Sequence, residues 1–258
     1  MCNKLPVIFI GHGNPMNAIL ENSYTEALKK LGEEIPKPKA IMVISAHWET
    51  EGVYITGEDE PKQIYDFYGF PKELFQVVYR PSGAKEYVEK VLNELKEENI
   101  LLDSKWGIDH GAWAVLKHMY PKADIPVFQM SLSKNKSELY HYNLGKKLSK
   151  LREMGILIVG SGNIVHNLAR MKYEMDDEPF DWAIEFDKFI AKAIEAGEHK
   201  KLIDYKKLGK AAELSVPTDE HYLPLLYIAA LQQEKDKVKF IYEGIQHGSM
   251  SMRCIKIG

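Results

Sequence analysis

The sequence predicts an α/β fold in which a central, mostly parallel or mixed sheet is flanked by helices. Four short runs rich in β-branched residues predict strands, and the segments between them carry apolar residues at helical spacing. This alternation of strand and helix is typical of sheets with parallel strands. The runs contain few polar residues, as expected for strands buried on both faces. They span residues 6–10, 40–45, 125–130 and 155–159.

Apolar stripes with a period of 3.6 residues predict the helices between these strands. The stripes are formed by Val88, Val91, Leu92 and Leu95, by Tyr140, Leu144, Leu148 and Leu151, and by Phe186, Phe189, Ile190 and Ala193. Residues 112–119 and 223–231 predict two further helices, and residues 238–242 and 252–257 predict a closing pair of strands. The polar segment 206–214 predicts a surface loop or a short helix. Segment 59–71, rich in aromatic residues, Pro and Gly, predicts a loop that covers part of the molecule.

The composition indicates one globular domain, residues 1–258, without a linker or an internal repeat. Apolar residues make up 45% of the 258, enough for a sizeable core. The net charge of −3 gives no basic excess, so neither nucleic acid nor a membrane is expected as a partner. Cys2 and Cys254 stand at opposite ends of the chain and do not suggest a disulfide framework. Without a signal peptide core or a spanning segment, we expect a cytoplasmic protein.

Histidines follow three of the predicted strands closely. They are His12 in Ile-Gly-His-Gly, His47 in Ser-Ala-His-Trp, and His166 in Gly-Asn-Ile-Val-His-Asn. Because ligands of open α/β sheets bind beyond the carboxyl ends of the strands, these imidazoles should meet at one rim. Imidazole is a common ligand of zinc, iron and copper, so the pattern predicts a metal site.

Two further histidines stand beside acidic residues. His110 follows Asp109 between glycines, and His221 follows Glu220 at the start of a predicted helix. Asp109 or nearby backbone is a candidate for orienting the His110 ring, and Glu220 is an alternative oxygen ligand to His221. Taken alone, each of the three strand-end histidines is more often a hydrogen-bonded structural residue. The alternative for Asp109 and His110 is a loop-capping pair, and for His221 it is a solvent-facing residue in the first turn of a helix. Their joint occurrence favours a site. The remaining histidines are expected to be structural; they are His118, His141, His199 and His247.

Five motifs, taken together in their order along the chain, resemble those of the class III extradiol ring-cleaving dioxygenases, in particular the DOPA 4,5-dioxygenase-like branch. The resemblance runs from the first strand to residues 244–251, so it covers nearly the whole chain. The motifs are Gly-His-Gly-Asn-Pro-Met at 11–16, Ser-Ala-His-Trp at 45–48, Asp-His-Gly at 109–111, Gly-Asn-Ile-Val-His-Asn at 162–167 and Pro-Thr-Asp-Glu-His-Tyr-Leu-Pro at 217–224.

The resemblance implies an enzyme that opens the aromatic ring of a catechol, DOPA-like substrate with O2. It implies one divalent metal per chain, held by His12, His47 and His221 with His166 as a possible fourth ligand. It also implies that His110 and His166 transfer protons to and from the substrate, a task suited to imidazole near neutral pH. The wider class completes its iron site with a carboxylate, whereas the branch resembles an all-histidine site. The metal is therefore expected to be Zn²⁺ or Fe²⁺.

Two other functions fit the same residues. Three histidines and a water would suit a zinc hydrolase, because the metal lowers the pKa of bound water to about 7. A non-enzymatic metal-binding protein on this fold is the other alternative, since a fold does not fix a function. For a planar substrate, segment 66–70 predicts an aromatic wall over the metal, with Tyr68 as one contact.

Overall fold

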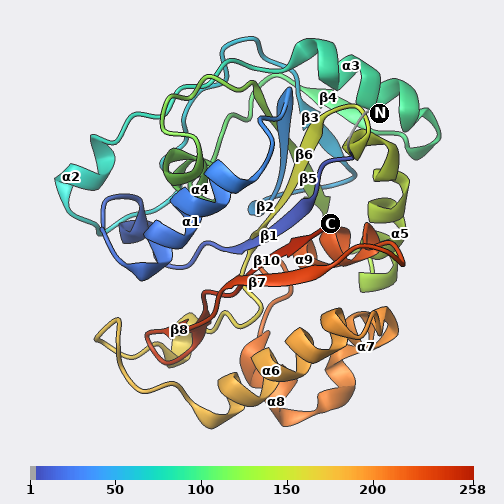
Figure 1. The fold of residues 1–258 in the computed structure, drawn as a ribbon. Coiled ribbons are helices and arrows are strands. Elements are labelled where there is room, and N and C mark those ends of the chain that lie inside the picture. The colour runs from blue at the N-terminus through green and yellow to red at the C-terminus, as the bar shows by residue number, and fades with distance from the viewer. Residues whose placement is uncertain (1–3) are drawn as a thin grey trace.

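The computed structural model describes residues 4–258 and has an eight-stranded sheet at its centre (Figure 1). Four parallel strands form the middle of this sheet. In spatial order they are β5 (Val127–Ser133), β2 (Ala40–Thr50), β6 (Ile156–Gly162) and β1 (Val7–Gly11). All four contain a run of apolar residues from which a strand was predicted.

Shorter strands extend the sheet on both sides. Beyond β5 lie β3 (Tyr54–Thr56), which is antiparallel to it, and β4 (Leu101–Asp103). Beyond β1 lie β10 (Cys254–Ile257) and β7 (Val238–Tyr242), each antiparallel to its neighbour. A separate small sheet pairs β8 (Ile245–Gln246) with β9 (Met250–Ser251). The sheet is therefore mixed, and the predicted α/β class and the predicted closing strand pair are both confirmed.

Side chains of the central strands alternate between two apolar layers. In β1, Val7 and Phe9 enter one layer, whereas Ile8 and Ile10 enter the other. Successive side chains of a strand point to opposite faces, so a strand covered on both sides must be apolar at every position. This explains why the central strands appear in the sequence as continuous apolar runs.

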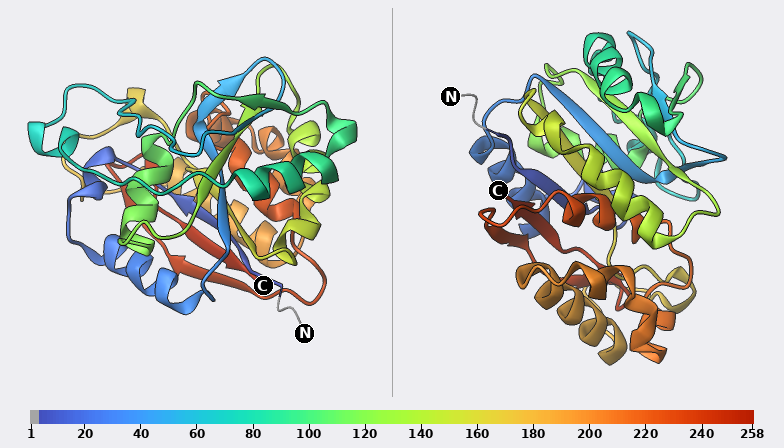
Figure 2. Two further views of the ribbon diagram at one scale, coloured as in Figure 1. Left: turned by 90° about the horizontal axis from the view of Figure 1, so that it is seen from above. Right: turned by 90° about the vertical axis from the view of Figure 1, so that its right-hand side faces the viewer.

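Helices cover both faces of the sheet (Figure 2). One apolar layer includes side chains of α1 (Ser23–Glu34), α2 (Lys72–Phe75) and α4 (His110–Met119). The other includes side chains of α3 (Lys85–Glu94), α5 (Glu138–Lys147), α6 (Asp181–Glu195), α7 (His199–Ile203), α8 (Lys210–Ser215) and α9 (Leu223–Ala230). Short 3₁₀ turns complete the set: η1 (Pro15–Ala18), η2 (Lys96–Glu98), η3 (Ser149–Arg152), η4 (Leu168–Arg170) and η5 (Tyr205–Leu208).

Several local predictions are refined by the structure. The stripe from Tyr140 to Leu151 is divided, because α5 ends at Lys147 and Leu151 belongs to η3. The segment 206–214 forms short helical turns instead of a loop. Segment 59–71 has no helix or strand and contributes one isolated bridge, between Gln63 and Ile108. Cys254 is a buried free thiol, whereas Cys2 lies outside the described residues.

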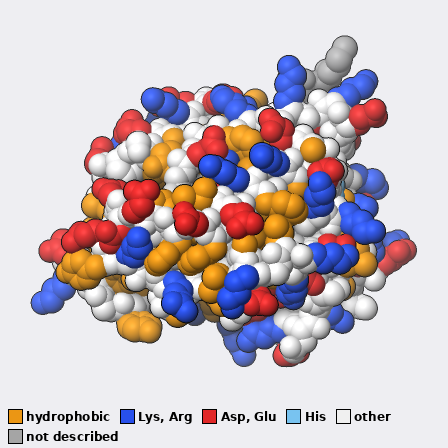
Figure 3. Space-filling model, turned by 90° about the horizontal axis from the view of Figure 1, so that it is seen from below, with side chains coloured by type: hydrophobic (Ala, Val, Ile, Leu, Met, Phe, Trp, Pro, Cys, Tyr) orange, Lys and Arg blue, Asp and Glu red, His pale blue; other side chains and the backbone are white. Residues whose placement is uncertain are grey.

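Acidic and basic side chains are interspersed on the surface. Figure 3 shows the face seen from below, where hydrophobic side chains lie between carboxylates and ammonium or guanidinium groups of both signs. This mixture agrees with the small net charge of −3. Across residues 4–258, none of the helices combines the length and the apolar character that crossing a bilayer requires.

Candidate active site

Five histidines gather at the carboxyl edge of the central strands. Ring centroids of His12 and His47 are 4.9 Å apart, those of His12 and His221 5.3 Å, and those of His47 and His110 4.1 Å. The ring of His166 stacks on that of His221, with centroids 3.5 Å apart. The histidines come from segments separated by most of the chain, and the sheet brings them together.

Each histidine is placed by a distinct local feature. His12 directly follows β1, and its N–H donates to the carbonyl of Gly162 at the end of β6 (3.0 Å). His110 is the first residue of α4. His221 precedes α9 by two residues, and its carbonyl accepts from Asn163 N–H (2.9 Å).

His47 lies within β2 and not after its end, because the strand continues to Thr50. The pairing of β2 with β5 shifts between Ile44 and Glu49, so His47 lies in an irregular stretch of the strand. Bulges of this kind re-aim side chains and are frequent beside active sites. The irregularity accounts for a ligand-type side chain in the interior of a strand.

Gly162 allows the ends of β6 and the segment before α9 to approach closely. A Cβ atom at this position would lie 2.1 Å from the carbonyl oxygen of His221. No side chain fits at that distance, so glycine is required here for His221 to reach the rim.

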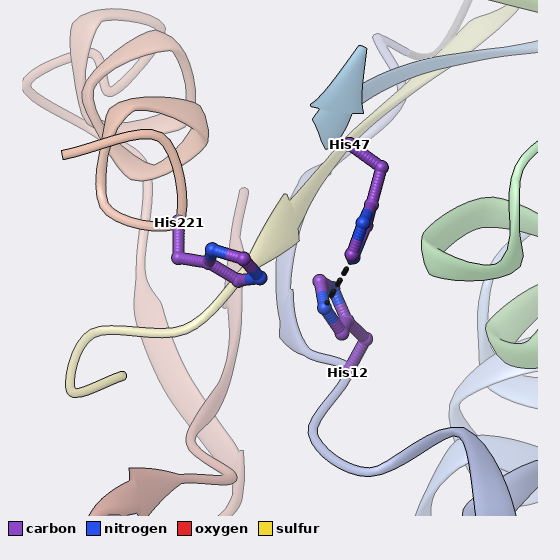
Figure 4. Close-up of side chains that lie close together, drawn as sticks. All are labelled: His12, His47 and His221. Carbon is purple, nitrogen blue, oxygen red and sulfur yellow. Dashed lines mark hydrogen bonds between the residues drawn. The ribbon is translucent and has the colours of Figure 1, made fainter. Parts of the chain in front are cut away.

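Three of the imidazoles form a compact donor set. His12, His47 and His221 each offer a ring nitrogen, and these nitrogens all lie within 4.8 Å of one another (Figure 4). Among the described residues, the other compact groups are His47 with Asp66 and His110, and His166 with Glu220 and His221. His166 shares no such group with His12 or His47.

Hydrogen bonds fix which nitrogen of His12 carries the proton. The hydroxyl of Ser161 donates to the carbonyl of Gly111 (2.6 Å), so its oxygen is left to accept from Nδ1 of His12 (2.9 Å). His12 is therefore protonated on Nδ1, and its Nε2 presents a lone pair. Hydrogen bonds from the outer nitrogen to a protein acceptor are the usual support of a metal-binding histidine.

Carboxylates occupy the same position behind the other two rings. Nδ1 of His221 lies 2.9 Å from Glu220 Oε1, and Nδ1 of His47 lies 3.2 Å from Asp66 Oδ2. A carboxylate only accepts, so the hydrogen bond with Glu220 places the proton of His221 on Nδ1. The nearby carboxylate of Asp66 favours the same tautomer for His47. Glu220, considered above as an alternative ligand, is thus turned toward the outer nitrogen of His221.

The donor set suits a metal ion. Nε2 of His12 and Nε2 of His47 are 3.1 Å apart, at hydrogen-bond distance (Figure 4). A proton on Nε2 of His47 would bridge them, whereas with both protons on Nδ1 two lone pairs face each other and a cation takes the place of that proton. Burial and the neighbouring His47 lower the pKa of His12, and burial and His110 lower the pKa of His47 to about 3. Both rings are neutral near pH 7, which is the protonation state in which an imidazole binds a metal.

His110 has a different partner from the one expected. Its Nδ1 lies 3.1 Å from Oδ2 of Asp66, and its backbone N–H donates to Oδ1 of the same residue (2.9 Å). Asp109 does not orient this ring, so that expectation was wrong. The Asp109 carboxylate caps α4 by accepting from Ala112 N–H (3.2 Å), and it also accepts from Ser45 (2.8 Å) and Gln129 (2.7 Å).

The buried carboxylate of Asp109 and the partly exposed carboxylate of Asp66 differ in their electrostatics. Burial and then the charge of Asp66 raise the pKa of Asp109 to about 6. Burial alone would raise the pKa of Asp66 as well, but its hydrogen bond with His110 and the charges of His110 and His47 lower it to about 2. Asp66 is the permanent anion at the rim, and sequence reasoning did not identify it as a partner of the histidines.

The aromatic segment 66–70 contributes only part of the expected wall. Phe67 meets His110 edge-on with ring centroids 5.4 Å apart, and it packs against Phe70 and Trp113. Tyr68 is 92% exposed and therefore does not form a closed wall over the histidines. Phe67, one residue earlier, takes the position beside the site.

The four histidines expected to be structural have protein partners outside the five-imidazole cluster. His118 bonds the carbonyl of Asn17, and His141 bonds the hydroxyl of Tyr227. His199 lies between Tyr142 and Gln232, and His247 lies between Asn14 and the carbonyl of Lys172.

Comparison with known proteins gives consistent matches over nearly the whole chain. Residues 6–252 match the family described as the catalytic LigB subunit of aromatic ring-opening dioxygenase. A 4,5-DOPA dioxygenase extradiol of Escherichia coli K12 is 40% identical over 99% of this chain and 95% of its own length. The protein of the same name from Beta vulgaris is 36% identical over 98% and 97%. A crystal structure of an uncharacterized Escherichia coli K12 protein superposes with a TM-score of 0.87 at 37% identity, covering 98% of this chain and all of that one.

Proposed function

We propose, from the premise that this chain belongs to the LigB family of aromatic ring-opening dioxygenases and is an extradiol dioxygenase, that its substrate is a catechol of the DOPA type. The observation that carries this proposal is the composition of the rim. Two imidazoles, His110 and His166, stand beside a three-imidazole donor set without belonging to it. Ring opening of a catechol needs both a metal site and groups that exchange protons with the substrate.

The proposed metal ligands are His12, His47 and His221. They present lone pairs toward one another and have acceptors behind their outer nitrogens, as an Fe²⁺ or Zn²⁺ site requires. Held by these residues, Fe²⁺ would supply the redox chemistry that a reaction between a catechol and O2 needs. We do not count His166 among the ligands, because its ring lies face to face with that of His221 at an interplanar angle of 10°.

His110 is the proposed base. With its Nδ1 turned to Asp66, its Nε2 carries a lone pair that takes a proton from a catechol hydroxyl. His166 is the proposed second proton-transfer group. Burial lowers the pKa of His166 to about 4, so it begins the reaction neutral and serves first as an acceptor. The edge contact of Phe67 with His110 offers apolar surface for the substrate ring.

The test is O2 uptake by the protein loaded anaerobically with Fe²⁺, on a panel of catechols that includes DOPA. We expect uptake with the formation of a yellow ring-opened product. His12→Ala should abolish both, and a substitution at an exposed position outside the histidine cluster, Asp59→Asn, should leave both intact. Hydrolysis of esters or amides by the Zn²⁺-loaded protein, with no O2 uptake under Fe²⁺, would replace this proposal by the zinc hydrolase. Metal binding with neither activity would favour the non-enzymatic alternative.

Three further expectations accompany the proposal. Residues 1–258 are proposed to form one catalytic domain, because the five histidines, from His12 to His221, meet at one edge of a single sheet. The substrate partners are a small aromatic diol and O2. The cytoplasmic location and the absence of nucleic acid or membrane partners stay predictions from the sequence.

A further inference from the structure

We propose that Asp66 is a positioning residue that sets the tautomer of two histidines at once, His47 of the donor set and His110 beside it. This inference rests on the proposed function only for the roles of the two histidines, as ligand and base. The carboxylate itself need not touch the metal or the substrate.

The geometry centres on a single oxygen atom. Oδ2 of Asp66 lies 3.2 Å from Nδ1 of His47 and 3.1 Å from Nδ1 of His110. Within residues 4–258, neither Oδ2 of Asp66 nor Nδ1 of His110 has a well-aligned hydrogen bond, so each relies on these close ion-pair contacts. The two atoms are buried and polar, so their mutual contact is what compensates for their loss of water.

The direction of the contacts follows from the chemistry of the groups. A carboxylate has no proton to donate, so a favourable contact requires N–H on Nδ1 of each ring. In a neutral imidazole the other nitrogen, Nε2, is then unprotonated. One oxygen therefore gives His47 the lone pair that a metal needs and gives His110 the lone pair that a base needs.

Asp66 is held in place although its segment has no regular secondary structure. Its Oδ1 accepts from the backbone N–H of His110 (2.9 Å), which fixes the carboxylate at the start of α4. Two residues earlier, the carbonyl of Ile64 accepts from the indole N–H of Trp113 (2.8 Å). The backbone N–H of Ile64 donates to the carbonyl of Ile108 (2.8 Å). The loop is thus attached to the segment that carries His110, and the carboxylate moves with it.

The decisive variant is Asp66→Asn, which keeps the size of the side chain. Its single oxygen can still accept from His110 N–H, but its NH2 group then faces both Nδ1 atoms. Donors facing donors are unfavourable, so both rings should change to the tautomer with the proton on Nε2. Asp66→Glu retains the carboxylate and should restore the parent tautomers in part. Asp59→Asn, in the same loop and exposed, is the matched control.

The first readout is the tautomer itself, from ¹⁵N chemical shifts of histidine-labelled protein prepared without metal. His47→Gln and His110→Gln assign the signals, and circular dichroism verifies that each variant is folded. The second readout is Zn²⁺ affinity by competition with a chromophoric chelator. We expect Asp66→Asn to convert both rings from Nδ1–H to Nε2–H and to weaken Zn²⁺ binding by about 10–100-fold. Asp59→Asn should match the parent in both readouts.

These readouts do not depend on the substrate, so the two proposals fail separately. If Asp66→Asn retains Nδ1–H on both rings and binds Zn²⁺ like the parent, the role of Asp66 is refuted, whatever the enzyme does with catechols. If the tautomers change and the affinity falls while the parent protein shows no O2 uptake, the role of Asp66 stands and the proposed function fails. A change at His47 alone would refute the shared role.

Discussion

Replacing Gly162 with alanine should damage the donor set without touching any histidine side chain. The added Cβ would lie 2.1 Å from the carbonyl oxygen of His221 and 3.3 Å from Cγ of Pro224. Ordinary contact requires more than ~1 Å of additional separation from that oxygen. Metal bonds tolerate deviations of about 0.2 Å, so a shift of the His221 backbone by this amount removes one ligand from reach.

The cost in stability should be about 1–3 kcal/mol, as for other overpacked sites, because the clash is with backbone and not with the end of a flexible side chain. The assay is thermal unfolding of the metal-free protein together with metal content after loading with Fe²⁺ or Zn²⁺. Gly244→Ala is the matched control, since its Cβ would meet the ring of Tyr242 at 3.1 Å and that ring can move. A Gly162→Ala protein with the parent melting temperature and full metal content would refute this reasoning.

Four further outcomes follow from the same geometry. His12→Ala and His47→Ala should each lose bound metal on elemental analysis, because each removes one of very few ligands. His110→Ala should keep its metal but lose about 10²–10⁴-fold in kcat, and turnover at the parent rate would disprove its role as a base. Ser161→Ala removes the acceptor behind His12 and should weaken Zn²⁺ binding by about 10–100-fold in a chelator competition. Burial lowers the pKa of His141 to about 4, so between roughly pH 6.5 and 4 the unfolded chain takes up a proton that the folded chain does not. Stability of the metal-free protein should therefore fall as the pH falls through this range, and His141→Gln should flatten the slope by at most about 1.4 kcal/mol per pH unit in denaturant titrations.

Much of the fold was predictable because its central strands are buried on both faces. Such strands have to be apolar at every position, and a continuous run such as 155–159 is easily recognised. The edge strand β4 was missed because it has three residues and its Leu101 and Leu102 are exposed. Helix α1 was missed as well, although Asn22 and Thr25 form a capping box at its start and could have revealed it.

The sequence predicted the part of the site whose residues are brought together by the ends of the parallel strands. The parallel order of β1, β2 and β6 brings the segments with His12, His47 and His166 to one edge. The partner of His110 depends instead on a long-range contact between a loop without periodicity and the start of α4. Sequence proximity suggested Asp109, but that carboxylate is turned inward by its role as the helix cap. No sequence pattern connects Asp66 with His110, 44 positions away.

The place of β1 in the sheet has a consequence for the order of folding. Its two neighbours are β6 and β10, and β2 to β5 lie between β1 and β6 along the chain. Both pairings therefore join segments far apart in sequence, which form slowly, and an apolar strand edge stays open until they close. Because His12 and His221 also belong to distant segments, the complete set of metal ligands is a property of the folded sheet and not of any local part of the chain.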